Sequence, residues 1–486
     1  MYTKFLVPNL LYCFAILGIV AGPVLAQQPV ELLIRDGVIV THDGRLESDI
    51  RVRNGVIVEI GQNLPSSSGA REIDASGLLV MPGGVDPHVH IGGADDFTSG
   101  SAAALAGGIT TISSFAWPRP GESLAEGVEQ YWAARVRARA IADVMLHPGI
   151  ANPNDQQSQM ATLPEFGQTS VKVFMSGPSF GQNARAYLDT LAAAGEAGVL
   201  TMMHCEDHAI IARAVERLMN QGRGSLRYFP DSRPVLAEVI ATRRAVAMAE
   251  ATGAPIYIVH LSSEGALRVA EDAQARGLPV FVETRPIYLH LTRERFEGPD
   301  RGLYVGNPPL REKKDQDALW EGIASGTIHV VGTDHVANTK ENKLDPSQTV
   351  ARFRAGMNNL QVIRPMLYSE GVRKGRITEE QFVAVTATNA AKLFGLYPRK
   401  GTIAVGSDAD LVLWDPDETR VIRDEDMLSG AGFSIYAGWE VTGWPRMTIR
   451  RGEVVYENGQ ITARPGSGEL LHRGRWQSPS QNRSAE

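Results

Sequence analysis

Residues 83–93, GGVDPHVHIGG, place two histidines two positions apart, directly after an apolar run that begins at Leu78. Successive side chains of a strand point to opposite faces, so His88 and His90 share one face. Such a pair either forms a polar strand end, with a histidine bonded to a backbone carbonyl, or binds a metal, for which imidazole is the commonest ligand. The pair alone does not decide between these two interpretations.

Seven further apolar runs of strand length follow this one, at residues 109–116, 142–150, 170–176, 198–207, 255–262, 278–286 and 328–335. Helix-like stretches separate several of them, at residues 123–142, 184–198, 233–253 and 265–277. Eight strands that alternate with helices predict an α/β fold of the (β/α)8 barrel type. The apolar runs show little alternation, which fits a parallel sheet that is buried on both faces.

Both flanks of this region have a different pattern. Residues 27–80 and 401–460 contain short strand-like runs, with Arg-Asn-Gly at 53–55 and Glu-Asn-Gly at 457–459 as hairpin turns. The simplest arrangement is a small β-sandwich built from both ends of the chain. We therefore predict a barrel at residues 81–400, the two sandwich parts around it, and a C-terminal tail at 461–486 that looks extended or mobile.

The first 26 residues have the layout of a secretory signal peptide. Lys4 precedes a long apolar segment without charges, and the small residues Val24 and Ala26 stand before a possible cleavage position. A membrane anchor is the alternative, which the segment's length barely permits. We expect export to the periplasm or the medium, with no stable membrane insertion after cleavage. Cleavage would remove Cys13 and leave Cys205 alone, so the mature chain would form no internal disulfide.

Composition excludes several classes of function. The chain has 486 residues, of which 43% are hydrophobic and 21% charged, and this is ordinary for a soluble globular protein. The net charge of −7 gives no electrostatic case for binding nucleic acid or an anionic membrane surface.

The predicted strand ends carry a cluster of polar residues. In a (β/α)8 barrel, chemistry occurs at the C-terminal ends of the strands. That rule gathers His88, His90, His204, His260 and Asp334 at one mouth. Each residue alone could be structural, but burial of so many polar groups without partners is costly. Together they favour a metal site.

Lys172, in the fourth predicted strand, is the unusual member of this cluster. An ammonium group would repel a metal, but burial and a nearby cation both lower the pKa of a lysine. The neutral amine can add carbon dioxide to give a carbamate, which offers two anionic oxygens. The alternative is a lysine that reaches the surface or pairs with an acid.

The sequence resembles the hydantoinase and dihydropyrimidinase group of cyclic amidohydrolases over nearly all of the predicted mature chain. The motifs that carry the resemblance include PGGVDPHVH (82–90), VKVFM (171–175), PIYIVHLS (255–262), NPPLREKKDQDALW (307–320), VGTDH (331–335) and TATNAAKLFGLYPRKGTIAVGSDADLVLWDP (386–416). The resemblance implies a metal-dependent hydrolase of carbon–nitrogen bonds in hydantoins, dihydropyrimidines or related ureides and imides. Attack by a hydroxide that bridges two metals is the implied mechanism.

The resemblance also implies a role for each residue of the cluster. His88, His90 and Asp334 match the ligands of the more buried metal, His204 and His260 match those of the second, and Lys172 matches the carbamylated lysine that bridges both. Asp334 further matches the residue that transfers the proton. Nitrogen and oxygen ligands favour two zinc ions, with manganese, iron and nickel as alternatives. Members of this group act on small molecules and are usually dimers or tetramers.

Several positions depart from the family pattern. Gly177 stands where a tyrosine donates to the developing oxyanion, and the loop after His90 is shorter than usual. Asn307 replaces a serine whose backbone contacts the substrate ring, so we expect it to bind substrate. Arg285 replaces a common cysteine, and it either binds an acidic substituent or pairs with an acid on a neighbouring helix.

These departures leave other functions open. One alternative is a different amide class, such as a dihydroorotase-like, allantoinase-like or exocyclic amide substrate. The other is a non-catalytic scaffold, which the six filled ligand positions disfavour.

Overall fold

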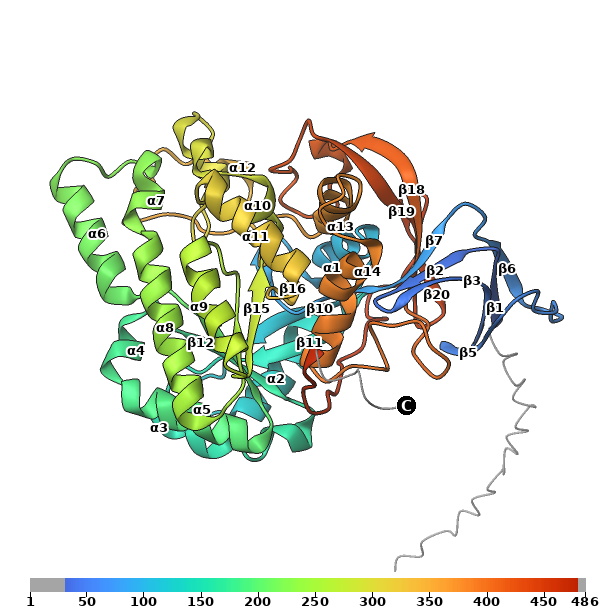
Figure 1. Cartoon of the computed structure of the whole chain (residues 1–486), viewed down its shortest axis with the longest axis horizontal. Coiled ribbons are helices and arrows are strands. Elements are labelled where there is room, and N and C mark those ends of the chain that lie inside the picture. Colours follow the sequence, from blue (N-terminus) through green and yellow to red (C-terminus); the bar gives the residue numbers. More distant parts are fainter. Residues whose placement is uncertain (1–30, 480–486) are drawn as a thin grey trace, which may run out of the picture.

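The computed structural model describes residues 31–479 (Figure 1). The predicted signal peptide lies outside these residues. No helix within residues 31–479 combines the length and the apolar character needed to cross a membrane.

Parallel strands form the central part of the fold. One sheet has the order β11–β10–β8 and a second has the order β12–β13–β14–β15–β16. Their bounds are β8 (Gly84–Asp86), β10 (Ile109–Ala116), β11 (Asp143–Pro148), β12 (Ser170–Phe174), β13 (Leu200–His204), β14 (Ile256–Ile258), β15 (Val280–Thr284) and β16 (Val330–Val331). A parallel bridge from Gly149 to Lys172 connects β11 with β12. All eight strands fall within the predicted apolar runs, and every residue of these strands except Phe174 is buried.

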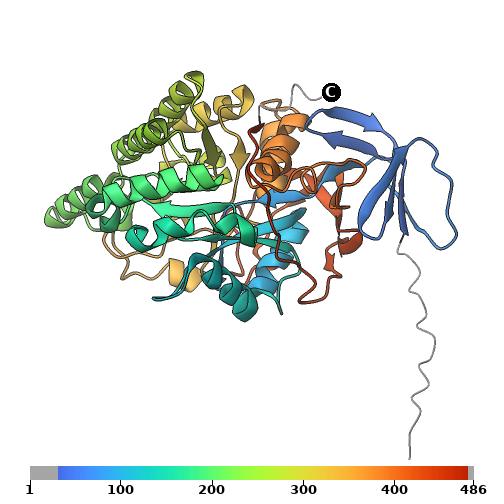
Figure 2. The ribbon, with the colours of Figure 1, turned by 90° about the horizontal axis from the view of Figure 1, so that it is seen from below.

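Helices cover these strands on their outer side (Figure 2). The longer ones are α1 (Phe97–Ala106), α2 (Leu124–Tyr131), α5 (Ala184–Ala197), α6 (His208–Asn220), α8 (Val235–Thr252), α9 (Glu264–Ala275) and α11 (Lys313–Ser325). Shorter ones are α3 (Pro153–Gln156), α4 (Pro178–Gln182), α7 (Phe229–Ser232), α10 (Pro286–His290), α12 (Lys340–Lys343), α13 (Ile363–Leu367), α14 (Glu379–Val383) and α15 (Asn389–Leu393). Glycine ends several of them in the left-handed conformation, for example Gly253 with φ 68° after α8. The strands and helices therefore alternate as the sequence predicts.

Two further sheets are built from the ends of the chain, and the second of them contains strands from both ends. One has the order β5–β4–β1–β6 and the other β21–β20–β19–β18–β7–β2–β3. The N-terminal strands are β1 (Glu31–Arg35), β2 (Val38–Thr41), β3 (Gly44–Glu47), β4 (Asp49–Arg53), β5 (Val56–Gly61), β6 (Arg71–Asp74) and β7 (Leu79–Pro82). The C-terminal strands are β18 (Leu411–Val421), β19 (Glu440–Arg450), β20 (Glu453–Glu457) and β21 (Gln460–Ile461). One buried cluster contains residues of both sheets, such as Leu32, Ile50, Val80 and Leu411.

The predicted hairpin turns have the expected geometry. Asn54 and Gly55 have φ of 52° and 83°, and Asn458 and Gly459 have φ of 46° and 86°. Positive φ at both central residues is the signature of the two-residue turn that suits the twist of antiparallel strands. These turns join β4 to β5 and β20 to β21.

The described part of the C-terminal tail is extended and packed, not mobile. Leu470 forms a parallel bridge with Val144 of β11, and Leu471 is fully buried. Arg473 donates to the Ser170 hydroxyl at 2.6 Å and to the Leu146 carbonyl at 2.8 Å. Because Ser170 begins β12, the tail holds the strands at the end opposite to the predicted site.

Candidate metal centre

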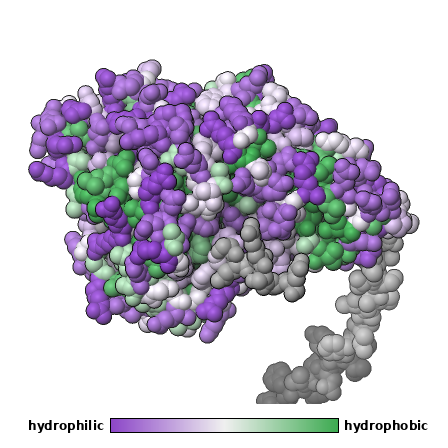
Figure 3. Space-filling view, viewed as in Figure 1, coloured by the Kyte–Doolittle hydropathy of each residue, from purple (hydrophilic) through white to green (hydrophobic). Residues whose placement is uncertain are grey.

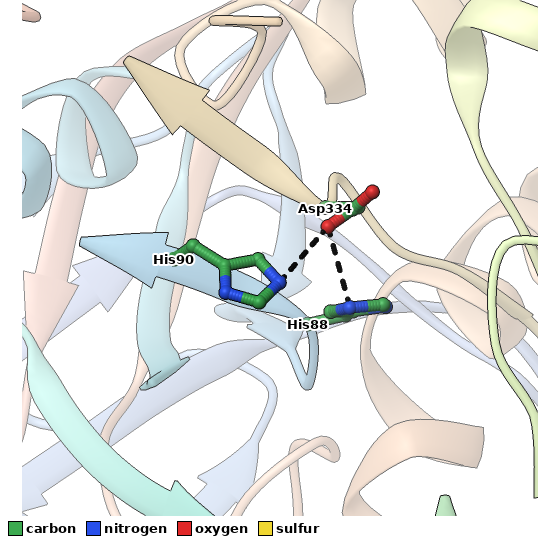
Figure 4. A group of neighbouring side chains, drawn as sticks. All are labelled: His88, His90 and Asp334. Carbon is green, nitrogen blue, oxygen red and sulfur yellow. Dashed lines mark ion pairs between the residues drawn. The ribbon is translucent and has the colours of Figure 1, made fainter. Parts of the chain in front are cut away.

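His88, His90 and Asp334 converge on one point (Figure 4). Oδ1 of Asp334 lies 3.3 Å from His88 Nε2 and 3.2 Å from His90 Nε2. Ligands about 2.0–2.1 Å from a tetrahedral zinc ion lie about 3.3 Å from one another, which both of these distances match. The ligand atoms of all three residues lie within 4.8 Å of one another, so together they could hold one metal ion.

Strand pairing produces this convergence. His90 lies in β9 (Val89–Gly93), which pairs in parallel with β17 (His335–Ala337), and Val336 is opposite His90. Asp334 immediately precedes β17. His88 occupies the short break between β8 and β9, where its side chain shares a face with His90, as the spacing predicts.

His204 and His260 form a second pair of imidazoles. Nδ1 of His204 and Nε2 of His260 are 2.8 Å apart, which is a hydrogen-bond distance. The His88 and His260 rings lie 5.4 Å apart between centroids, so the second pair is next to the first group. All five predicted ligands on the strand ends therefore line one cavity of about 220 Å³, together with Phe174, Arg285 and Asn307.

Lys172 is fully buried beside the first group, with Nζ 3.4 Å from His88 Nε2. Its Nζ lies over the rings of Phe115 and Phe174 at 5.2 and 5.1 Å, and it forms no ion pair with a carboxylate of residues 31–479. Burial lowers the pKa of this amine to about 8. The structure therefore contradicts the alternative for Lys172, in which the side chain reaches the surface or pairs with an acid.

Two glutamates that the sequence analysis did not single out hold the histidines in place. Glu283 Oε1 lies 2.7 Å from His88 Nδ1 and also accepts the backbone N–H of His260 at 3.0 Å. Glu206 Oε2 lies 2.7 Å from His204 Nε2, and Arg233 contacts the same carboxylate at 2.6 Å. Glu283 follows from the same strand-end rule that located the histidines, because it lies at the end of β15.

Burial sets the protonation of these groups. It lowers the pKa of His88 and His260 well below the usual value, and Lys172 lowers that of His88 further. Burial also raises the pKa of Asp334, but Arg285 and His88 outweigh this effect and hold it well below its ordinary range. Neutral imidazoles beside an ionised carboxylate are the forms that bind metal.

Arg285 has a partner that the sequence analysis did not foresee. We expected an acidic substituent or an acid on a neighbouring helix, but Arg285 is fully buried and its Nη1 lies 3.0 Å from Oδ2 of Asp334. Asp334 lies in no helix, because it immediately precedes β17, and it belongs to the candidate site itself. The helix-partner interpretation is therefore wrong.

The remaining histidines near the strands have structural partners. Nε2 of His335 lies 2.8 Å from Asp95 Oδ2, away from His88 and His90, as alternation along the strand predicts. His147 is buried between the Ser170 hydroxyl and the Pro87 carbonyl. His208 begins α6 and contacts the Ser176 carbonyl at 3.0 Å.

Two of the positions that depart from the family pattern, Asn307 and Gly177, have no close partner for the side chain. Asn307 lines the cavity, and its Oδ1 is buried without a hydrogen-bond partner among the described residues. Gly177 has an extended backbone with φ −98° and ψ 156°, and a Cβ built there would meet nothing within 4 Å. The structure thus leaves room for a Cβ at the position where the sequence resemblance implies a tyrosine.

Comparisons with known proteins identify the class. Residues 79–455 match the model of the amidohydrolase family. The D-hydantoinase of Ralstonia pickettii is 37% identical over 91% of this chain and 99% of its own, and that of Geobacillus stearothermophilus is 38% identical over 91% and 97%. The crystal structure of dihydropyrimidinase from Brevibacillus agri superposes with a TM-score of 0.88, at 34% identity, over 93% of this chain and 100% of that one.

The chain therefore belongs to the amidohydrolase family and, within it, to the hydantoinase and dihydropyrimidinase group of cyclic amidohydrolases.

Proposed function

We propose that this protein hydrolyses a carbon–nitrogen bond of a small cyclic amide with two divalent metal ions, preferably zinc, and a carbamate on Lys172. The observation that carries the proposal is the convergence of His88, His90 and Asp334 at metal-ligand spacing, next to the His204–His260 pair. His88, His90 and Asp334 would hold one ion, His204 and His260 the other, and the Lys172 carbamate would bridge them.

Bound divalent ions would acidify water and polarise the amide carbonyl. The residues of the chain then have separate tasks. Asp334 would accept a proton from the attacking water and deliver it to the leaving nitrogen. Asn307 would orient the ring through its unpartnered side-chain oxygen, which accepts from a ring N–H. Phe174, which lines the cavity with His204, would exclude water from one side.

We also propose that the parallel strands form a closed barrel and that the two terminal sheets form a β-sandwich. The Gly149–Lys172 bridge joins the two parallel sheets on one side, and the Thr333 N–H donates to Asp86 Oδ1 at 3.3 Å on the other. These contacts support one closed (β/α)8 barrel at residues 81–400. The buried cluster shared by the two terminal sheets supports a β-sandwich at 27–80 and 401–460.

Metal content and a substrate panel test the proposed activity. Purified protein supplied with zinc and bicarbonate is expected to hold close to two ions per chain by elemental analysis. It should open at least one ring in a panel of hydantoin, dihydrouracil, dihydroorotate and allantoin, and a chelator should abolish that turnover. A chain that binds no stoichiometric metal and opens no ring would support the scaffold alternative.

We also propose that the chain is exported and that it forms dimers or tetramers. The charged and then apolar first 26 residues support export, and N-terminal sequencing of the mature protein should begin near Gln27.

Apolar surface lies over α6 and α8 (Figure 3), where Met219 and Leu236 are 43% and 57% exposed, and this supports self-association. Sedimentation of a monomer only, or a mature chain that begins at Met1, would contradict these two proposals.

A further inference from the structure

Arg285 directs all three nitrogens of its guanidinium at one short segment. Nε donates to the Thr333 carbonyl at 3.1 Å, and Nη2 donates to the Asp334 carbonyl at 3.2 Å. Nη1 forms an ion pair with Oδ2 of the Asp334 side chain at 3.0 Å, without the alignment of a hydrogen bond. Arg285 forms no other ion pair among residues 31–479, and its guanidinium carbon lies 5.7 Å from the centroid of the Tyr288 ring.

Asp334 is a residue whose conformation needs support. Its φ is 43°, in the left-handed region that non-glycine residues seldom occupy. His260, another proposed ligand, has φ 42° and is held through its N–H by Glu283. Strained backbone at a site persists only where the surrounding structure fixes it. For Asp334, the contacts with Arg285, the residue directly after β15, supply that fixation.

The two carboxylate oxygens of Asp334 have different partners. Oδ1 lies between His88 and His90, at 3.3 and 3.2 Å, whereas Oδ2 faces Arg285. A rotation of the side chain that moved Oδ1 away from the histidines would break the ion pair. The ion pair between Oδ2 and Arg285 therefore favours the side-chain rotamer in which Oδ1 points to the metal position.

We propose that Arg285 is a positioning residue that holds Asp334 in its ligating conformation, so that the His88–His90–Asp334 site is preorganised before a metal binds. The inference rests on the proposed function, because it takes Asp334 as a ligand. Residues that orient metal ligands typically contribute about 10–100-fold to metal affinity or activity. Lysine could not replace this arginine, because a single ammonium cannot reach two carbonyls and a carboxylate with the geometry of the planar fork.

Zinc affinity of the apoprotein, measured by competition with a chromophoric chelator, tests the proposal without reliance on activity. Arg285→Met is expected to bind zinc at the tighter site about 10–100-fold more weakly than wild type. Arg285→Lys, which keeps the charge and is the variant expected to fold most readily, should show a similar loss. Added guanidinium ion should restore part of the affinity of Arg285→Met and leave that of wild type unchanged.

Arg364→Met is the matched control. Arg364 is equally buried and donates to the carbonyls of Gly108 and Pro82, which precede β10 and β8, at the strand ends opposite to those that carry the proposed ligands. This variant is expected to lose thermal stability but to bind zinc as tightly as wild type. An equal loss of affinity in Arg364→Met would mean that Arg285 acts only through general stability, and the proposal would be wrong.

Two other results would also overturn the inference. If Arg285→Met binds zinc with wild-type affinity and raises KM only for ring amides with a carboxylate, Arg285 binds substrate and does not position Asp334. If it binds zinc normally and turns over all substrates normally, the contact has no role. Failure of the proposed function is distinguishable, because then wild type itself would not bind zinc.

Discussion

Lys172→Ala is expected to bind little metal and to lose activity by a factor on the order of 10³ or more. Metal ions contribute several kcal/mol to the stabilisation of transition-state charge, and each ~1.4 kcal/mol corresponds to a factor of ten in rate. The alanine removes both oxygens that the carbamate would supply to the metals. Elemental analysis and turnover of the best ring substrate measure the two effects.

Chemical rescue separates a missing bridge from a damaged fold. Acetate or propionate in excess should restore some metal binding and rate to Lys172→Ala, since a carboxylate offers the two missing oxygens. Removal of carbon dioxide and bicarbonate during reconstitution should lower the metal content of wild type but not that of the rescued variant. Burial lowers the pKa of the Lys172 amine to about 8, which favours the neutral form. The neutral amine is the form that reacts with carbon dioxide.

Lys392→Ala is the control for this experiment. Lys392 is also buried, and its Nζ lies 3.3 Å from His42 Nε2, which resembles the contact of Lys172 with His88. The Lys392 variant should keep its metal and its rate. If Lys172→Ala also keeps both, Lys172 is a structural lysine and the two-metal proposal has to be abandoned.

Strand periodicity was sufficient to predict where the candidate ligands lie. Buried parallel strands appear in a sequence as short apolar runs, and their C-terminal ends meet at one edge. That rule alone brings His88, His204 and Asp334 together. The structure confirms the convergence, although His260 and Asp334 lie two and three residues beyond their strands, in left-handed conformations that no spacing predicts.

The contacts around the ligands could not be predicted in the same way. Glu283 lies on the same strand ends as the histidines, but only coordinates show that one carboxylate serves both His88 and His260. The sequence left open which acid pairs with Arg285. The answer depends on distances of a few ångströms between the segments that follow β15 and β16. The tail was similarly ambiguous, because its polar composition does not reveal that Leu471 and Arg473 are buried.

Gly177→Tyr is expected to raise kcat for hydantoin and dihydrouracil by about 10²-fold, with a smaller change in KM. The resemblance to hydantoinases implies a tyrosine hydroxyl here that donates to the developing oxyanion, and loss of one such donor costs about 10²–10³-fold in rate. The donor acts on charge that develops in the transition state, so its effect belongs in kcat. Wild type should accordingly open these two plain rings slowly.

The backbone at Gly177 can accept the substitution. Pro178 follows it and restricts the residue to extended conformations, and φ −98° with ψ 156° is a conformation that tyrosine adopts without strain. A Cβ at this position would meet no atom within 4 Å, so the first atom of the new side chain has room. A failure of Gly177→Tyr to fold is therefore not expected, and its melting temperature should match that of wild type.

Gly177→Phe distinguishes the hydroxyl from the ring. Both variants fill the same space beside the cavity, but only tyrosine can donate to an oxyanion, so phenylalanine should leave kcat for the plain rings near its wild-type value. An equal gain in both variants would show that the ring acts by excluding water. A wild type that already opens dihydrouracil at about 10 per second, an ordinary turnover for an enzyme, would mean that another donor replaces the tyrosine. In that case the open space at Gly177 does not slow the opening of the plain rings.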